Sequence, residues 1–316
     1  MKVLVTGGSG FIGKRLVQSL VNNGCEVSVL SRRDNYAVPN GAKVLKCDLT
    51  VNSELLKEHV VGCDIVYHCA GEIKDEALMH SLHVGGTQRL LNAVLTEAKI
   101  NNRVIHWVQL SSVGVYGPPS GAASLNRVIT ELSPLNPVGE YEITKTESDK
   151  LLLKTAETGL ITYTIVRPSN VFSDDMPNQS IRSLGKMIKK GLFFYIGKSG
   201  ATATYIHVDD VVELLLLCMK DNRVTNKVFN ISNDCSLEQM TIGIAGSLNV
   251  KVPKFRLPEN LVRLFVSIVG VGIKLPLTQE RINTLVSRTV YPYSKLEKEL
   301  GFSPRILVPD SIGEVF

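Results

Sequence analysis

Three polar residues in the middle of the chain have the types and spacing needed for proton transfer. Tyr141 and Lys145 lie four positions apart in the stretch YEITK, which places them on one face of a helix. A free tyrosine has a pKa near 10 and is a poor base at neutral pH, but a neighbouring ammonium favours the phenolate. Upstream, Ser112 follows the strand-like run VIHWVQL and adds a hydroxyl where parallel sheets keep their ligands. Each signal is weak alone, and the combination predicts an acid/base site.

A cluster of glycines follows a strand-like run at the start of the chain, in MKVLVTGGSGFIG. Glycine permits a tight turn and lets the backbone approach a pyrophosphate, and the positive end of the helix that begins near Phe11 faces that anion. The cluster reads as G-x-G-x-x-G from Gly8, or as G-x-x-G-x-x-G through Gly7, Gly10 and Gly13. Both spacings predict a dinucleotide site.

The second strand-like run ends with Ser31, Arg32 and Arg33, where an NAD-specific chain usually has an acidic residue. A carboxylate at this place binds the ribose 2′-hydroxyl, whereas an arginine can bind a 2′-phosphate and stack on adenine. The sequence therefore favours NADP(H) over NAD(H). In the alternative interpretation the arginines only solubilise the loop and Asp34 turns inward.

The composition of the 316-residue chain is that of a globular protein, with 44% hydrophobic and 21% charged residues. The net charge of +5 is spread without a basic run interleaved with aromatics, so we expect no nucleic-acid partner. The six cysteines form no C-x-x-C pair and most lie in apolar surroundings, and the histidines show no metal spacing. With no signal peptide, these features predict a cytoplasmic protein without a metal site.

One segment, LVRLFVSIVGVGIKL at 261–275, is strongly apolar. The apolar run between Arg263 and Lys274 is shorter than the roughly 20 residues that span a bilayer. We expect no membrane span and interpret the segment as a buried helix, with contact to a membrane surface as the alternative.

Short Val/Ile/Leu-rich runs alternate with helical patterns up to about residue 170. Continuous apolar strands separated by helices imply a parallel sheet covered on both faces, so the fold class is α/β, with a doubly wound parallel sheet of Rossmann type. The runs expected to form strands are Lys2–Thr6, Glu26–Ser31, Lys43–Lys46, Ile65–Cys69, Val104–Leu110 and Thr162–Val166. The expected helices are Ile12–Asn23, Glu54–His59, Leu78–Ala98 and Tyr141–Thr158.

This alternation breaks after Arg167-Pro168 and returns only in YIHVDDVVELLLLCMK and KVFNIS. We therefore expect a dinucleotide-binding domain made of 1–170 plus about 205–235. A smaller, discontinuous substrate-binding domain would contain about 171–204 plus 236–316.

In their joint occurrence these motifs resemble the extended short-chain dehydrogenase/reductase family, in its NAD(P)-dependent sugar epimerase/dehydratase branch. The likeness covers nearly the whole chain, with YHCAG, RPSNVF, YIHVDDVV and YSKLEKELGFSP as further landmarks. It favours the glycine spacing T-G-x-x-G-x-x-G that begins at Thr6 and Gly7. The resemblance implies that the cofactor contacts Gly7, Gly10, Phe11, Ile12, Gly13, Ser31, Arg32, Asp48, Leu49, Cys69, Ala70, Gly71, Tyr141, Lys145, Pro168 and Val171.

The same resemblance implies a mechanism. Tyr141 would exchange a proton with the substrate oxygen, Ser112 would hydrogen-bond the same oxygen, and Lys145 would hold the ribose hydroxyls and lower the pKa of the tyrosine. Asn170 in RPSNVF would contact the small-molecule substrate. The catalytic residues implied are thus Ser112, Tyr141 and Lys145, with Ser112 and Asn170 binding substrate.

Departures from the family pattern narrow the reaction. Family 4,6-dehydratases place an Asp-Glu pair directly after the catalytic hydroxyl residue, where this chain has Val113 and Gly114, which cannot transfer protons. Many nucleotide-sugar members have an arginine before I-H-V-D that pairs with the diphosphate, where this chain has Ala203-Thr204. Arg182, Arg281 and Arg288 are candidate replacements, and His83, in place of the usual asparagine, is interpreted as structural rather than as a proton relay.

The resulting hypothesis is a nucleotide-sugar 4-epimerase or 4-keto reductase. The alternative is an NADPH-dependent reductase of an apolar ketone or aldehyde, similar to hydroxysteroid dehydrogenases and dihydroflavonol reductases. A non-catalytic dinucleotide sensor is disfavoured because such relatives typically lose the tyrosine or lysine. Family members commonly dimerise through two helices per subunit, here Ser81–Lys99 and Tyr141–Thr158, so we expect a homodimer.

Overall fold

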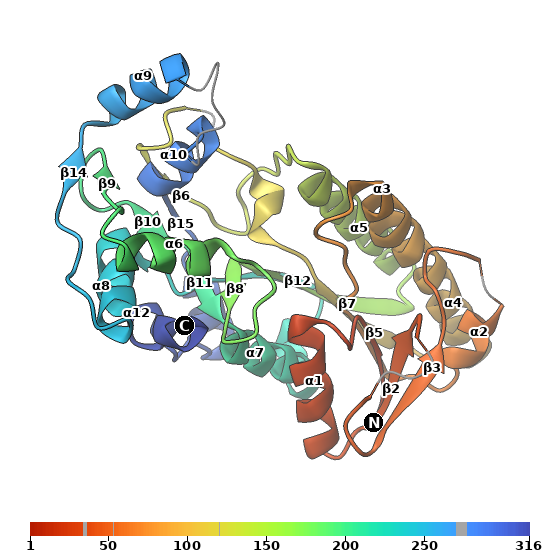
Figure 1. Cartoon of the computed structure of the whole chain (residues 1–316). Coiled ribbons are helices and arrows are strands. Elements are labelled where there is room, and N and C mark those ends of the chain that lie inside the picture. Colours follow the sequence, from red (N-terminus) through yellow and green to blue (C-terminus); the bar gives the residue numbers. More distant parts are fainter. Residues whose placement is uncertain (34–36, 53, 120, 270–276) are drawn as a thin grey trace.

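A seven-stranded sheet forms the centre of the computed structural model, which describes residues 1–33, 37–52, 54–119, 121–269 and 277–316 (Figure 1). The strand order is β12-β7-β5-β4-β1-β2-β3, and every neighbouring pair is parallel. The strands are β1 (Lys2–Thr6), β2 (Glu26–Ser31), β3 (Ala42–Lys46), β4 (Ile65–His68), β5 (Ile105–Leu110), β7 (Ile161–Pro168) and β12 (Lys227–Ile231). The expected doubly wound Rossmann sheet is confirmed.

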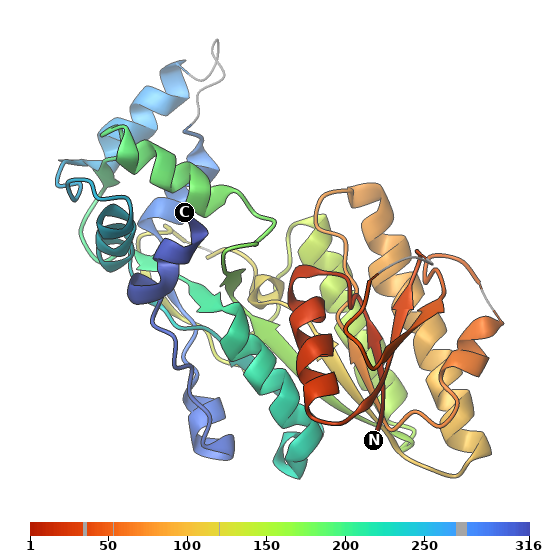
Figure 2. The ribbon, with the colours of Figure 1, turned by 60° about the horizontal axis from the view of Figure 1, so that its bottom comes forward.

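Helices cover both faces of this sheet, as the continuous apolar strands predicted (Figure 2). Along β1, Val3 and Val5 join one hydrophobic cluster and Leu4 joins the other, because alternate side chains of a strand point to opposite faces. The first face is covered by α1 (Phe11–Asn22) and α7 (Val208–Lys220), and the second by α2 (Leu55–His59), α4 (Thr87–Ile100) and α5 (Glu140–Ala156).

The helix expected at Leu78–Ala98 is divided into three parts. A short α3 (Glu76–Met79) leads into a π-helical segment, η1 (His80–Gly86), before α4 begins. The hydroxyl of Thr87 donates a hydrogen bond to the carbonyl of His83, so this carbonyl of the preceding turn accepts a bond from a side chain. Apolar periodicity alone does not reveal such a π segment.

A second layer of short elements packs beyond the carboxyl ends of β7 and β12 (Figure 1). The helices α6 (Ser180–Lys189), α8 (Leu237–Ser247) and α12 (Val308–Ser311) share one hydrophobic cluster, and α9 (Glu259–Val269) and α10 (Gln279–Val286) share another. By contrast, α11 (Ser294–Leu300) places Leu296 and Leu300 in the core of the central sheet. The domain boundaries expected from the sequence stay a prediction.

The apolar segment 261–275 falls partly on α9, and residues 270–276 lie outside the described residues. Val262 and Val266 are buried against α10, so the buried-helix interpretation holds for this side of α9 only. The opposite stripe of α9 is exposed, with Leu261 60%, Leu264 58%, Phe265 58% and Ile268 67% accessible. No helix in the described part of the chain is long and apolar enough to cross a bilayer, and contact with a membrane surface stays a prediction.

Packing within one subunit accounts for part of the apolar character of the run LLLKTA on α5. Leu152 is fully buried in the cluster between α5 and the sheet, and Leu151 and Leu153 are half-buried against it. The homodimer predicted from this run therefore stays a prediction.

We expect Leu152→Ala to lower the free energy of unfolding by about 2–5 kcal/mol, because it leaves a cavity in a close-packed core. Leu132→Ala is the matched control, since Leu132 is 95% exposed and its truncation should change stability by about 0.5 kcal/mol or less. Urea unfolding of both variants measures the difference. Equal effects would contradict the assignment of Leu152 to the core.

Candidate active site

The carboxyl ends of β1 and β4 are tied together beside the glycine turn. The hydroxyl of Thr6 lies 2.8 Å from Nδ1 of His68 and accepts a hydrogen bond from the amide of Ala70 at 3.2 Å. Thr6 thereby fixes the turn Cys69–Gly71 against the loop that follows β1. Two segments predicted to contact the cofactor are thus adjacent.

The glycine turn has the shape of a phosphate cradle. Gly7 has φ +67°, and a Cβ added to it would lie 2.6 Å from the backbone nitrogen of Ala70. A Cβ added to Gly13 would collide with the carbonyl of Gly7. Helix α1 begins after Gly10 without a side-chain cap and has no acidic residue in its first turn, so its amino end is open to an anion. The residues present fit a dinucleotide pyrophosphate.

Beyond β2, the carboxylate of Asp48 lies near enough to Arg32 for the guanidinium to lower its pKa. The carboxylate of Asp48 accepts hydrogen bonds from the amide and hydroxyl of Thr50 at 2.8 and 2.7 Å. Burial acts to raise its pKa, but these bonds and the charge of Arg32 leave the pKa of Asp48 below its usual value. Leu49 is buried, and the hydroxyl of Ser31 bonds to the backbone of Arg33.

Asp34, the alternative ribose reader, lies outside the described residues. The described end of β2 therefore carries the hydroxyl of Ser31 and two exposed residues, Arg32 and Arg33.

Helix α5 carries Lys145 into the space between the sheet and the turn at Gly71. The ammonium donates a hydrogen bond to the carbonyl of Leu110 at 2.9 Å, at the end of β5. A Cβ added to Gly71 would lie 3.6 Å from the same nitrogen, at van der Waals distance, so Gly71 is its neighbour. Burial lowers the pKa of Lys145, and the charge of Asp149 partly opposes this shift. The lysine thus lies between α5 and the predicted cofactor turn.

The structure does not show the lowered pKa that the sequence argument expected for Tyr141. Burial raises the pKa of Tyr141 to about 12, and the carboxylates of Glu142 and Asp149 act in the same direction. The buried ammonium of Lys145 is itself less stable as a charge, which weakens the effect that the sequence argument relied on. Tyr141 is therefore held as a phenol, which can donate a proton.

Ser112 stands where the sequence predicted, directly after β5. Its hydroxyl caps the short 3-10 helix η2 (Val113–Tyr116) by accepting a hydrogen bond from the amide of Gly114 at 3.1 Å. The carboxylate of Glu142 lies against the same place, because a Cβ added to Gly114 would lie 3.4 Å from Oε1 of Glu142 and 3.3 Å from Oγ of Ser112. The sequence analysis missed Glu142; its only signal was its position next to Tyr141 on the helix.

A buried ionic network supports this end of α5. Asp149 accepts hydrogen bonds from Ser111 at 2.8 Å and from Arg167 at 3.1 Å. Arg167 continues to the hydroxyl of Tyr116 at 3.0 Å, which in turn donates to Asn230 on β12 at 2.9 Å. The network therefore joins the helix to β7, to β12 and to the residue that follows β5.

His83 has the structural role that the sequence predicted. Its Nε2 accepts a hydrogen bond from the amide of Glu72 at 2.8 Å, so the proton is on Nδ1, which faces Thr144 Oγ1 at 2.8 Å. The ring meets that of Tyr141 edge-on, with centroids 5.6 Å apart. Burial and the charge of Lys145 lower the pKa of His83 to about 3, which keeps the imidazole neutral.

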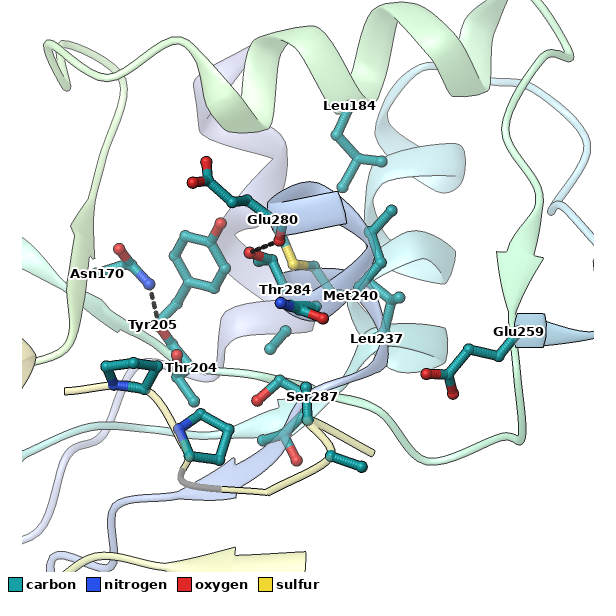
Figure 3. A pocket seen from close by; sticks show the side chains of 18 of the residues that line it. Asn170, Leu184, Thr204, Tyr205, Leu237, Met240, Glu259, Glu280, Thr284 and Ser287 are labelled. Carbon is teal, nitrogen blue, oxygen red and sulfur yellow. Dashed lines mark hydrogen bonds between the residues drawn. The ribbon is translucent and has the colours of Figure 1, made fainter. Parts of the chain in front are cut away.

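A cavity of about 780 Å³ extends from Asn170 into the second layer (Figure 3). Asn170 and Val171 lie on β8 (Asn170–Phe172), directly after Pro168 ends β7, and β8 pairs with β11 (Tyr205–His207). The amide of Asn170 donates to the carbonyl of Thr204 at 3.0 Å, and Tyr205 lies beside it in the cavity wall (Figure 3). Asn170 is therefore placed to contact a ligand in the cavity.

The arginine that lines this cavity is one the sequence analysis did not select. Arg263 of α9 faces it, while Arg182, Arg281 and Arg288 are not among the described lining residues. Its guanidinium bonds Glu259 at 2.9 Å and also bonds the side chains of Gln279 and Asn283. Glu259 and Glu280 line the cavity as well. Its charges are thus mixed rather than cationic, and only tertiary packing reveals this.

The buried neutral histidines predict acid sensitivity. His83 has a folded-state pKa of about 3 against about 6.5 when unfolded, so the unfolded chain binds its proton more readily. The contribution of His83 to stability is complete above pH 6.5 and is lost as the pH falls toward 3. In His83→Asn we expect the free energy of unfolding to fall less steeply below pH 6, by about 1.4 kcal/mol per pH unit. Urea unfolding between pH 4 and 7 measures this slope, and an unchanged slope would contradict the neutral His83.

Comparisons with known proteins agree with this geometry. Residues 3–232 match the NAD dependent epimerase/dehydratase family. The chain is 24% identical over 267 residues to N-acetyl-alpha-D-glucosaminyl-diphospho-ditrans,octacis-undecaprenol 4-epimerase of Escherichia coli O157:H7, covering 82% of this chain and 76% of that protein. It is 29% identical over 223 residues to 4-hydroxy-2-methyl-3-oxo-4-farnesyl-3,4-dihydroquinoline-1-oxide ketoreductase of Stigmatella aurantiaca, covering 69% of this chain and 64% of that protein.

The crystal structure of UDP-glucuronic acid 4-epimerase from Bacillus cereus in complex with NAD has the same fold. It matches with a TM-score of 0.72 at 19% identity, covering 99% of this chain and 94% of that one. Because the family match covers more than half of the sequence, this chain belongs to the NAD dependent epimerase/dehydratase family and is a nicotinamide-dependent enzyme.

Proposed function

We propose that the protein is an oxidoreductase of nucleotide sugars that acts at carbon 4, as a 4-epimerase or a 4-keto reductase. The observation that carries this proposal is the position of Lys145, whose ammonium lies between Gly71 of the cofactor turn and the end of β5 that leads to Ser112. Tyr141 is one helical turn away on the same face of α5. The cavity that begins at Asn170 has the size for a substrate beyond this point.

Each residue has a defined task in this reaction. The nicotinamide cofactor supplies hydride transfer when bound, held by the glycine turn and by Lys145 at the ribose hydroxyls. Ser112 donates a hydrogen bond to the substrate oxygen and fixes its position. Tyr141, a phenol in this structure, gives its proton to that oxygen as a ketone becomes an alcohol, or recovers the proton in the reverse direction. Asn170 orients the part of the substrate in the cavity.

One observation supports a net reductase that uses NADPH. The exposed Arg32 at the end of β2 offers a cation for a 2′-phosphate. One of the similar proteins is named as a 4-epimerase and the other as a ketoreductase, so the relatives include both proposed reactions, epimerisation and ketone reduction.

Changing Tyr141 to Phe removes the proton donor but keeps the ring. We expect its turnover of a UDP-4-keto sugar with NADPH, or of UDP-glucose with retained NAD, to fall by about 10²–10⁴-fold. Tyr163→Phe is the control, because Tyr163 lies within β7 away from the site. Nicotinamide absorbance and product analysis measure both. Full activity of Tyr141→Phe would rule out the proposed chemistry and favour a non-catalytic sensor.

Replacing Arg32 with Ala tests the cofactor. Loss of a charge-assisted contact to a 2′-phosphate should raise the KM for NADPH by about 10–100-fold and change the KM for NADH little. Arg33→Ala is the matched control, as a second exposed arginine at the same strand end. A purified protein that retains NAD tightly, or an Arg32→Ala variant with unaltered NADPH preference, would favour the NAD-dependent epimerase instead.

A second candidate, reduction of an apolar ketone or aldehyde, is supported by the cavity walls. Arg263 is already bonded to Glu259, and Leu184, Leu237 and Met240 also line the cavity. Activity with an apolar cyclic ketone and none with UDP-sugars would establish this candidate and exclude the first.

A further inference from the structure

Two carboxylates in the loop after β8 bind the first turns of helix α1. The guanidinium of Arg15 donates hydrogen bonds to the hydroxyl of Ser173 at 2.9 Å and to the carboxylate of Asp174 at 3.1 Å. It also lies 2.8 Å from the carboxylate of Asp175, which the ammonium of Lys14 contacts as well. A single exposed ion pair contributes little to stability, but these charges form one network. We call the contact between these five residues the β8–α1 clasp.

The loop that carries the two carboxylates is anchored in the second layer. Arg182 of α6 donates hydrogen bonds to the backbone carbonyls of Asp174 and Met176, the latter at 2.8 Å. The side chain of Met176 is buried in the hydrophobic cluster that α6, α8 and α12 share. The clasp therefore joins the second layer to the helix that begins after the glycine turn.

The two sides of the clasp are segments predicted to contact the cofactor. Helix α1 begins at Phe11, and the guanidinium carbon of Arg15 lies 5.3 Å from the centroid of the Phe11 ring. On the other side, Val171 lies on β8, two residues before Ser173. The ring of Phe11 also packs against the cluster that contains Phe172 of β8. The clasp thus holds together two segments that the dinucleotide is expected to contact.

The charges of the clasp do not themselves favour an anionic cofactor. Asp209 of α7 adds a third carboxylate, 3.8 Å from Nε of Arg15. Among the ion pairs of the described residues around Arg15, carboxylates therefore outnumber cations, and both cations are already bonded. Carboxylates near the amino end of α1 would repel a pyrophosphate. Any contribution of Asp175 to cofactor binding must then come from holding β8 in place.

We propose that the β8–α1 clasp retains the nicotinamide dinucleotide, and that Arg15 and Asp175 are positioning residues that hold β8 against α1. Release of the cofactor would require β8 to move away from α1, which breaks the ion pairs of the clasp. The same movement would shift Asn170, which lies on β8 and lines the cavity. The link to substrate rests on the proposed function, whereas retention of the dinucleotide is measurable without a sugar.

The rate constant of cofactor release tests the proposal. It is measured by stopped flow from the fluorescence of bound NADPH, and in parallel of bound NADH, after mixing with excess oxidised cofactor. Asp175→Asn keeps the size of the side chain and removes the charge that pairs with Lys14 and Arg15. We expect release to become about 3–10-fold faster, because the weakened clasp opens more often.

A purely electrostatic effect of Asp175 has the opposite sign. Loss of a carboxylate near the pyrophosphate would hold the anionic cofactor more tightly and slow its release. Slower or unchanged release in folded Asp175→Asn would therefore overturn the proposal. Circular dichroism checks that each variant is folded.

Asp209→Asn is the matched control. It removes the same charge near Arg15, but Asp209 lies on α7, so the contact between β8 and α1 stays in place. Release should stay within about twofold of the wild type. An acceleration equal to that of Asp175→Asn would assign the effect to charge rather than to the clasp and would overturn the proposal.

Arg15→Gln breaks the clasp from the side of the helix and should also accelerate release. Adding Asp175→Asn to this variant should accelerate release less than the same change does in the wild type, because both changes break one contact. Fully independent effects of the two changes would contradict the clasp. This cycle also decides the question if Asp209→Asn does not fold.

Release without substrate separates the clasp from the proposed function. Faster release in Asp175→Asn, in a protein that turns over no UDP-sugar, would support the clasp and refute the nucleotide-sugar substrate. Unaltered release in an enzyme that does turn over a UDP-4-keto sugar would refute the clasp alone.

Discussion

The buried carboxylate of Asp149 is the constraint on which the site depends. Helix α5 presents a polar face to the interior, including Thr144, Lys145 and Ser148, so apolar area alone cannot hold it in place. A buried charge is costly unless it is paired and hydrogen-bonded, and Asp149 finds Arg167 and Ser111 only in one position of the helix. Sliding α5 along the sheet would leave the carboxylate of Asp149 buried without these partners. The location of Tyr141 therefore follows from an ion pair two helical turns away.

The same burial changes how the catalytic pair behaves. Desolvation disfavours the charged form of both groups, so it lowers the pKa of Lys145 and raises that of Tyr141. Reasoning from the spacing Y-x-x-x-K considers only the attraction between ammonium and phenolate. In the folded chain, burial and the carboxylates of Glu142 and Asp149 raise the pKa of Tyr141. The spacing of the two residues alone therefore does not predict this pKa.

Much of the fold was predictable because its signals are local. A parallel strand buried on both faces must be apolar throughout, and β1 and β2 begin and end at the predicted residues. The glycine turn was predictable for the same reason, since Gly7 and Gly13 have backbone neighbours that exclude any side chain. The division of the helix before α4 was not, because apolar periodicity alone does not reveal a π-helical segment.

The parts of the site that the sequence did not reveal come from contacts between distant segments. Glu142 became visible only when Gly114, from another segment, proved to leave space for its carboxylate. In the sequence, Arg263 only marked the border of an apolar run, yet it lines the cavity. The three arginines considered from the sequence are not among the described lining residues. No residue spacing encodes either relation, because both arise from how α5 and α9 pack.

The charged residues that line the cavity affect which class of substrate it can bind. Its described walls hold the carboxylates of Glu259 and Glu280 but one guanidinium, that of Arg263, which is already bonded to Glu259. To bind the guanidinium of Arg263, an anionic diphosphate would have to displace the carboxylate of Glu259. It would thereby replace a charge-assisted hydrogen bond of 2.9 Å. A neutral ketone needs no such exchange and would leave the pair intact. If substrate binds in this cavity as proposed, the Arg263–Glu259 pair is the feature that would distinguish the two substrate classes.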